Sequence, residues 1–122
     1  RTYFIGNLTN KQKSVYKIVM DAKEAAVRIL ASGVACAEVE RVARQVIERA
    51  GYARFILHHA GHQIGRENFE LPAFVPYSKD MLEEGMVTTV EIGLYVPDIG
   101  GVRIEDDYLI AKSGSALLSH CP

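Results

Sequence analysis

The chain has 122 residues, enough for one domain, and its 14 lysines and arginines nearly balance its 15 aspartates and glutamates. A formal charge of −1 offers no basic surface for nucleic acid or an anionic membrane, and no apolar run is long enough to span a bilayer. The opening RTYFIGNL lacks the layout of a signal peptide, and Cys36 and Cys121 are too far apart for a metal knuckle. We therefore expect a soluble, cytoplasmic protein with reduced thiols.

The chain begins with a segment that alternates like a strand, RTYFI at residues 1–5. Asn7, Thr9 and Asn10 follow it and are candidate N-caps. We therefore expect a short strand and then a helix.

Two amphipathic helices are predicted next. Apolar residues recur at helical spacing from about residue 10 to 31, and Ser32-Gly33 ends that run. A second stripe spans residues 36 to 50 and ends at Gly51. Both stripes indicate faces buried in a core.

Beyond residue 51 the pattern changes to a period of two, and glycines separate short apolar runs. Residues 54–64 are expected to be extended, and the stretch with Pro72 and Pro76 to be a loop. Residues 82–96 and 101–111 are predicted to form a hairpin around PDIG. Helices followed by an antiparallel sheet make the expected fold class α+β.

If the hairpin is symmetric about Asp98, paired positions have numbers that sum to 196, so Glu91 lies opposite Glu105. Arg103 and Tyr95 share their face, and the alternate apolar residues lie on the other. Two like charges opposite one another are destabilising and favour a cation between them. The hairpin alone favours a different interpretation, an exposed face on which Arg103 is the salt-bridge partner of the glutamates.

The stretch HHAGHQIG (58–65) adds a third group of ligand-type side chains. If it is extended, His58 and His62 lie on one face, whereas Gly61 and Gly65 argue against a helical zinc pair. An imidazole with two carboxylates suits zinc, manganese, cobalt or iron better than calcium.

Three ordered motifs resemble those of the pita-bread metalloenzymes, the family of methionine aminopeptidases, Xaa-Pro aminopeptidases, prolidases and creatinases. The motifs are GHQIG (61–65), TTVEIGLY (88–95) and GVRIEDDYLI (101–110), of which the last is most similar to the prolidase branch. The resemblance covers nearly the whole chain. It implies that residues 1–122 are the C-terminal half of a pita-bread catalytic domain, truncated at its N-terminus.

The resemblance implies a role for several residues. His62, Glu91 and Glu105 match ligands of two divalent metals (manganese, cobalt or zinc), and Glu91 matches a group that helps to move a proton. His58 matches a catalytic histidine on the substrate side. Arg103 and Tyr95 match residues that hold the ligands in place. His59 and His120 match no site residue.

Three departures accompany the resemblance. The family supplies two more aspartate ligands from a D-x-T-R-T strand, and this chain begins at Arg1-Thr2, so these ligands are absent and the chain alone is expected to be inactive. Phe69 stands where the family's peptidases have the histidine of HExP, and phenylalanine cannot form imidazole's hydrogen bond. Ile92 replaces a proline beside a ligand.

The favoured hypothesis is therefore that the chain is part of a dinuclear peptidase that cleaves peptides near proline. The complete protein is expected to include the missing N-terminal half and to form a homodimer. One alternative is a creatinase-like hydrolase of another C–N bond, without the peptidase metal site. The other is a non-catalytic binding module of the same fold, against which the retained ionisable groups argue.

Overall fold

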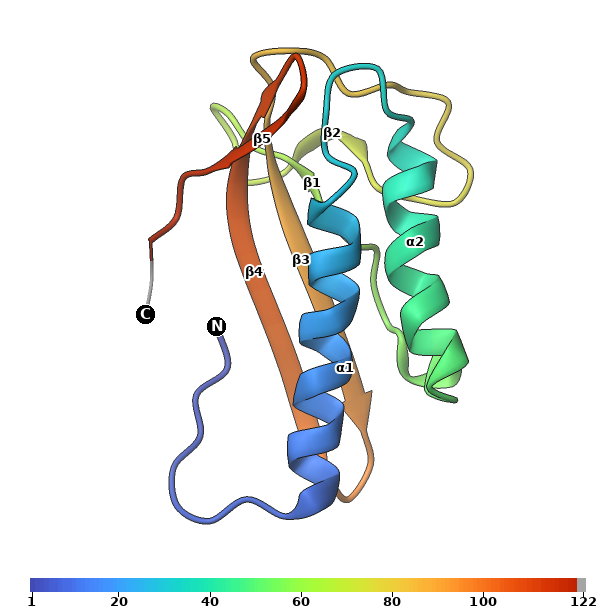
Figure 1. The fold of residues 1–122 in the computed structure, drawn as a ribbon, viewed down its shortest axis with the longest axis vertical. Helices are drawn as coiled ribbons and strands as arrows, with labels where there is room; N and C mark the ends of the chain where they lie inside the picture. The colour runs from blue at the N-terminus through green and yellow to red at the C-terminus, as the bar shows by residue number, and fades with distance from the viewer. Residues whose placement is uncertain (121–122) are drawn as a thin grey trace.

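The computed structural model describes residues 1–120, and it has two helical segments followed by a five-stranded antiparallel sheet (Figure 1). The strands are ordered β2-β1-β3-β4-β5 across the sheet. This arrangement confirms the predicted α+β fold class. The elements are α1 (Asn10–Val27), α2 (Cys36–Arg49), the 3-10 helix η1 (Ala53–Phe55), β1 (His62–Gln63), β2 (Glu70–Ala73), β3 (Val87–Val96), β4 (Gly100–Ala111) and β5 (Gly114–Leu117).

Helix α1 begins at a capping box and ends earlier than the sequence pattern predicts. Of the three candidate N-caps, Thr9 is the one used: its side chain accepts from the backbone N–H of Gln12, whose own side chain accepts from the Thr9 backbone N–H. The predicted end at residue 31 was wrong. The helix ends at Val27, where the hydrogen bonds shorten to the 3-10 type, and this tighter turn directs Leu30 into the core.

Helix α2 agrees with its predicted span, and it begins at Cys36, a buried free thiol. Cys121 lies outside the described residues, so the predicted state of that second thiol stays a prediction. No helix in the described part of the chain is long and apolar enough to cross a membrane.

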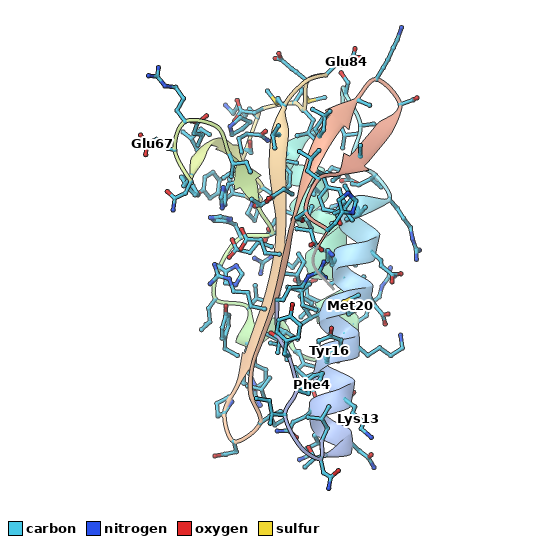
Figure 2. All side chains as sticks on the ribbon, turned by 90° about the vertical axis from the view of Figure 1, so that its left-hand side faces the viewer. Phe4, Lys13, Tyr16, Met20, Glu67 and Glu84 are labelled. Carbon is cyan, nitrogen blue, oxygen red and sulfur yellow. The ribbon has the colours of Figure 1, made fainter. Side chains whose placement is uncertain are left out.

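The N-terminal segment does not form the predicted strand. Residues 1–5 form no ladder of backbone hydrogen bonds with β4 in the described structure; instead, the Thr2 hydroxyl bonds both the N–H and the carbonyl of Arg103. Phe4 packs edge-on against Tyr16 of α1, with ring centroids 4.8 Å apart (Figure 2). Alternating residues predict a strand only where a neighbouring strand edge bonds the backbone throughout, and here side-chain contacts hold the segment.

The hairpin of β3 and β4 has the predicted register. Glu91 pairs with Glu105, and Gly93 with Arg103, as the sum of 196 requires. Strand β3 begins at Val87 rather than at residue 82, because the preceding residues form a turn closed by the bond from Met86 N–H to the Glu83 carbonyl. Strand β5, which pairs with the end of β4, was not predicted.

Two further predictions about loops were wrong in part. Residues 54–64 are not one extended stretch, because η1 occupies its start and only His62–Gln63 pair as a strand. The expected loop around Pro72 contains β2, which is the edge strand of the sheet. Proline is tolerated there because the outer side of an edge strand needs no ladder donor.

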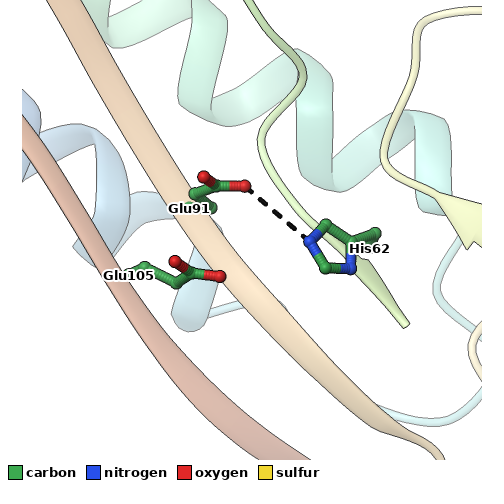
Figure 3. Close-up of side chains that lie close together, drawn as sticks. All are labelled: His62, Glu91 and Glu105. Carbon is green, nitrogen blue, oxygen red and sulfur yellow. Dashed lines mark ion pairs between the residues drawn. The ribbon is translucent and has the colours of Figure 1, made fainter. Parts of the chain in front are cut away.

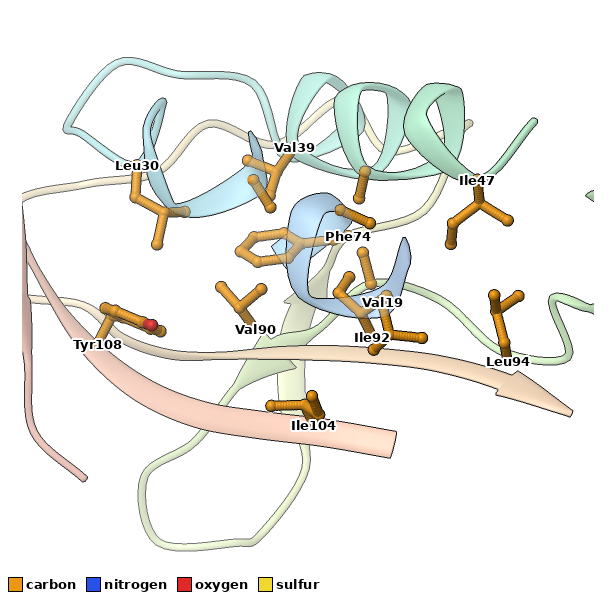
Figure 4. Packing of buried hydrophobic residues seen from close by; sticks show 14 of the residues in the cluster. Val19, Leu30, Val39, Ile47, Phe74, Val90, Ile92, Leu94, Ile104 and Tyr108 are labelled. Atoms are coloured by element: carbon orange, nitrogen blue, oxygen red, sulfur yellow. The ribbon is translucent and has the colours of Figure 1, made fainter. Parts of the chain in front are cut away.

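The hydrophobic core lies between the helices and one face of the β3–β4 hairpin, as Figure 4 shows. The even-numbered residues of the hairpin face α1, and the odd-numbered residues face the opposite side. Packing on one face therefore leaves the other for the functional side chains. The largest fully buried apolar side chains are Phe74, Leu30, Leu82, Leu94, Ile104, Ile110, Val15, Val19, Val39 and Val90.

One ion cluster interrupts this core. Asp106, on the core side of β4, forms an ion pair with Lys23 of α1 and accepts hydrogen bonds from Arg1 (2.7 Å) and Ser119 (3.0 Å). The side chain of Asp106 is 1% exposed and that of Lys23 10%. The cluster joins both ends of the described chain to the centre of the sheet.

Candidate metal centre

The odd-numbered face of the hairpin brings an imidazole beside two carboxylates (Figure 3). His62 comes from β1, Glu91 from β3 and Glu105 from β4, and one ligand atom of each lies within 4.8 Å of the others. His62 and Glu91 are buried, whereas Glu105 is partly exposed. Three strands thus converge on one cluster that is open to solvent on one side.

The backbone fixes which nitrogen of His62 faces the cluster. Nδ1 lies 2.9 Å from the carbonyl oxygen of Gln63, which can only accept, so in the neutral ring Nδ1 carries the proton. Nε2 then has a free lone pair and lies 3.8 Å from Oε2 of Glu91. A ring nitrogen oriented in this way by a carbonyl on its other side is typical of histidine ligands to metals.

The two oxygens of Glu91 face different neighbours. Arg103, on the neighbouring strand, contacts Oε1 as an ion pair, whereas Oε2 faces Nε2 of His62. The Arg103 side chain is 54% exposed, so it neutralises the pair of glutamates only from the rim. The salt-bridge partner expected from the sequence is therefore present, and it leaves the side of Glu91 that faces His62 without a cation.

A second set of contacts holds His58 beside the cluster. Its Nδ1 lies 2.9 Å from the His59 carbonyl and its Nε2 lies 3.0 Å from the Tyr95 hydroxyl. Arg103 donates to that hydroxyl at 3.4 Å, so the hydroxyl proton points to His58. Burial raises the pKa of Tyr95, which keeps this proton in place at neutral pH. Both nitrogens of His58 are thus engaged, and contact with a substrate would require Tyr95 to be displaced.

His59 and Phe69 form an aromatic group over His62. The Phe69 ring lies 4.7 Å from the ring of His62 and 5.7 Å from that of His59, between centroids. Burial, followed by the charges of His62 and His58, lowers the pKa of His59 and favours its neutral form. Phe69 therefore contacts a candidate ligand directly while offering it no hydrogen bond.

Two glycines allow the histidine loop to lie on β3. A Cβ atom at Gly61 would meet the Thr89 carbonyl oxygen at 2.1 Å, and one at Gly93 would meet Nε2 of His58 at 2.5 Å. A side chain at Gly61 would displace the loop, because it meets backbone, and one at Gly93 would displace the His58 imidazole. The separation between the histidines and the hairpin is therefore set by the absence of two side chains.

The structure brings together every site residue predicted from the sequence: His58, His62, Glu91, Tyr95, Arg103 and Glu105. Sequence reasoning missed Glu40 of α2, which is 3% exposed and accepts the Ala60 backbone N–H at 2.7 Å. A signal was present, because Glu40 is a charged residue at a helical spacing of three and seven from the buried Ala43 and Ile47.

The arrangement fits a divalent cation. Nε2 of His62 and Oε2 of Glu91 face one another 3.8 Å apart, and the paired carboxylates of Glu91 and Glu105 repel one another, so a cation between these groups would be favourable. Mixed nitrogen and oxygen ligands favour transition metals and zinc over calcium.

Comparison with known proteins shows that the chain is similar to peptidases. Metallopeptidase family M24 matches residues 1–112. An Xaa-Pro dipeptidase of Pyrococcus horikoshii is 43% identical over 119 residues, and a putative dipeptidase of Bacillus subtilis is 39% identical over 122. These alignments cover 98% and 100% of this chain but 34% of each relative, so the chain spans about a third of their length.

Solved structures agree with the sequence comparison. An Xaa-Pro dipeptidase from Bacillus anthracis superposes with a TM-score of 0.96 at 38% identity, over 100% of this chain and 34% of that one. A prolidase from Pyrococcus furiosus also has a TM-score of 0.96 and 38% identity, over 100% and 36%. These likenesses confirm the predicted pita-bread fold. The chain therefore belongs to metallopeptidase family M24.

Proposed function

We propose that residues 1–122 form the C-terminal half of the catalytic domain of a metal-dependent peptidase that hydrolyses peptides near proline. The observation that carries this proposal is the convergence of His62, Glu91 and Glu105 within 4.8 Å, with the two glutamates paired across the hairpin. The names of the relatives, Xaa-Pro dipeptidase and prolidase, support the substrate class. The complete protein is proposed to be a cytoplasmic homodimer.

In this proposal the three strands hold His62, Glu91 and Glu105 as ligands of two divalent ions, of which manganese, cobalt and zinc are the candidates. Such ions, when bound, acidify water and polarise a peptide carbonyl. The two further ligands are proposed to come from aspartates in another part of the protein.

The chain's own residues have the remaining roles. Glu91, which is buried beside His62, would accept and return a proton. Arg103 would orient Glu91 and hold Tyr95, which in turn positions His58. Once Tyr95 is displaced, Nε2 of His58 would accept a hydrogen bond from a peptide N–H, because Nδ1 donates to the His59 carbonyl.

Metal content and hydrolysis test this function together. The longest natural polypeptide that contains these residues should be purified without chelator, loaded with manganese and assayed on Xaa-Pro dipeptides. We expect two metals per chain, metal-dependent hydrolysis, and loss of both in Glu105→Ala. Asp107→Asn is a matched control, because Asp107 is an acidic residue on the same face of β4, and it should keep both.

A second candidate function is creatinase-like hydrolysis of another C–N bond, and Phe69 is the observation that favours it. Its ring packs on His62 where the family's peptidases have a histidine. A full-length protein that binds no metal and cleaves no Xaa-Pro peptide would favour this candidate over the first. A full-length protein with two metals but unchanged turnover in Glu105→Ala would contradict the proposed role of Glu105.

A further inference from the structure

Glu40 is a buried carboxylate that no part of the proposed reaction uses. It lies on α2 with a side chain 3% exposed, and both of its oxygens are engaged. Oε1 accepts from Nη2 of Arg44 at 2.6 Å and from its Nε at 3.0 Å. Oε2 accepts the backbone N–H of Ala60 at 2.7 Å.

Ala60 is the midpoint between the two site histidines. It stands two residues after His58 and two before His62, and its carbonyl accepts the backbone N–H of Glu91 at 2.7 Å. The peptide groups of Ala60 are therefore bonded on one side to α2 and on the other to the strand that carries Glu91. This one residue joins the histidine loop to both layers of the fold.

Before Ala60 the loop is restrained mainly by side chains, through the contact of His58 with Tyr95. The backbone bond from Ile56 N–H to the Ala53 carbonyl closes η1, and Leu57, which follows, is 70% exposed. After Ala60, the His62 N–H donates to the Thr89 hydroxyl at 3.2 Å. Glu40 thus bonds the backbone at Ala60 to α2, just before His62.

Burying a carboxylate is costly unless its charge is compensated. Glu40 is 3% exposed, and one of its oxygens bonds a single backbone N–H. A neutral acceptor at that position would stabilise the fold about as well. The position of Glu40 is better explained by the reach of a glutamate from α2 to the buried Ala60, which a shorter side chain would not span.

We propose that Glu40 is a positioning residue that sets the placement of His58 and His62 against Glu91 by holding the Ala60 N–H. The expected effect of Glu40 on metal affinity rests on the proposed function. Its effect on the positions of the two imidazoles does not depend on a metal. Glu40 touches neither substrate nor ligand atoms, and it acts through the backbone of the loop.

Two substitutions separate the reach of the side chain from its charge. Glu40→Asp keeps the charge and withdraws the acceptor by one methylene. Glu40→Gln keeps the reach and a carbonyl oxygen for Ala60 and removes the charge. Glu38→Asp is the matched control, since Glu38 lies on the same helix and pairs with Arg41 at the exposed surface, away from the loop.

The experiment uses the longest natural polypeptide that contains these residues, with folding checked by circular dichroism. Cobalt titration should show about tenfold weaker binding in Glu40→Asp, and binding within about threefold of the unsubstituted protein in Glu40→Gln and Glu38→Asp. In the metal-free protein, the imidazole proton resonances of His58 and His62 should shift in Glu40→Asp and stay in place in Glu38→Asp.

Unchanged imidazole resonances and unchanged cobalt affinity in a folded Glu40→Asp protein would overturn the proposal. A loss in Glu40→Gln as large as in Glu40→Asp would also overturn it, because charge rather than reach would then matter. Absence of cobalt binding in the unsubstituted protein would count against the proposed metallopeptidase function alone. In that case the histidine resonances of the metal-free variants still decide the role of Glu40.

Discussion

Nε2 of His62 lies 3.8 Å from Oε2 of Glu91, and both side chains are buried. The carbonyl of Gln63 turns that nitrogen toward the carboxylate from a strand of only two residues. A short strand, fixed on one side by its own backbone, thus aims the imidazole at the hairpin.

This relationship predicts that substitutions of His62 and His59 affect metal binding differently. His62→Ala in the full-length protein should weaken cobalt binding at least about 100-fold, because it removes a ligand rather than a supporting group. His59→Gln should change it by no more than about threefold, since the His59 ring packs against the rings of His58, His62 and Phe69 and has no position among the ligands. Calorimetric titration measures both, and equal losses would contradict the assignment of His62.

Gly93 sets how closely His58 approaches β3. Gly93→Ala would place a Cβ atom 2.5 Å from Nε2 of His58 and 2.9 Å from the Tyr95 hydroxyl, so the imidazole must move. We expect a destabilisation of about 1–3 kcal/mol in urea unfolding and a clear loss of hydrolysis. Gly101→Ala is the control on the same face, because its Cβ would meet only the flexible edge of the Tyr95 ring at 3.1 Å. A larger effect at Gly101 than at Gly93 would show that contact with His58 is unimportant.

The ion pair of Lys23 and Asp106 should be costly to break on one side. Asp106→Asn leaves the Lys23 ammonium buried without its counter-charge, and we expect a loss of about 3–5 kcal/mol in the free energy of unfolding. The double variant Lys23→Met with Asp106→Leu removes both charges. Its loss of unfolding free energy should be smaller than the sum of the losses in Lys23→Met and in Asp106→Leu alone. Urea denaturation measures these differences. Strict additivity of the two changes would refute coupling between the charges.

Cys36 makes stability depend on pH in the alkaline range. Burial, followed by the charge of Asp80, raises the pKa of the Cys36 thiol from 9.0 to about 11. The folded state therefore keeps the proton when the unfolded chain has lost it, so this contribution is complete below about pH 9 and is lost as the pH rises to about 11.

Unfolding free energies measured from pH 8 to pH 11 test this dependence. Cys36→Ala should fall less steeply over that window than the unsubstituted chain, and both proteins should carry Cys121→Ser to remove the second thiol. The native Cys36 should also resist alkylation at pH 8 and react once urea is added. Identical pH slopes with and without Cys36 would show that its ionisation is not coupled to folding.

Much of the site followed from local patterns. The hairpin register was predictable because alternation with a period of two and a turn at Asp98 leave one pairing that buries Ile92 and Ile104 together, and that pairing sets Glu91 against Glu105. Helix α2 was also predictable from a local pattern, because its apolar stripe repeats at helical spacing and Gly51 follows its end.

The failures came from segments whose structure depends on distant neighbours. Residues 1–5 alternate like a strand, but Thr2 meets β4 through its side chain. Pro72 suggested a loop, and the edge of the sheet accepts it. Both outcomes depend on whether a neighbouring strand pairs with the segment, which cannot be predicted from the composition of the segment itself.

The sequence by itself determined the fold class, the hairpin register and the identity of the candidate ligands, because each depends on periodicity or on a motif within a few residues. Only the tertiary structure decided how the ligands meet. It placed His62 over the hairpin through Gly61 and Thr89, bonded Ala60 to Glu40, and paired Lys23 with Asp106. These contacts join residues 20 to 83 positions apart, and their geometry exists only after the helices have packed on one face of the sheet and left the other free.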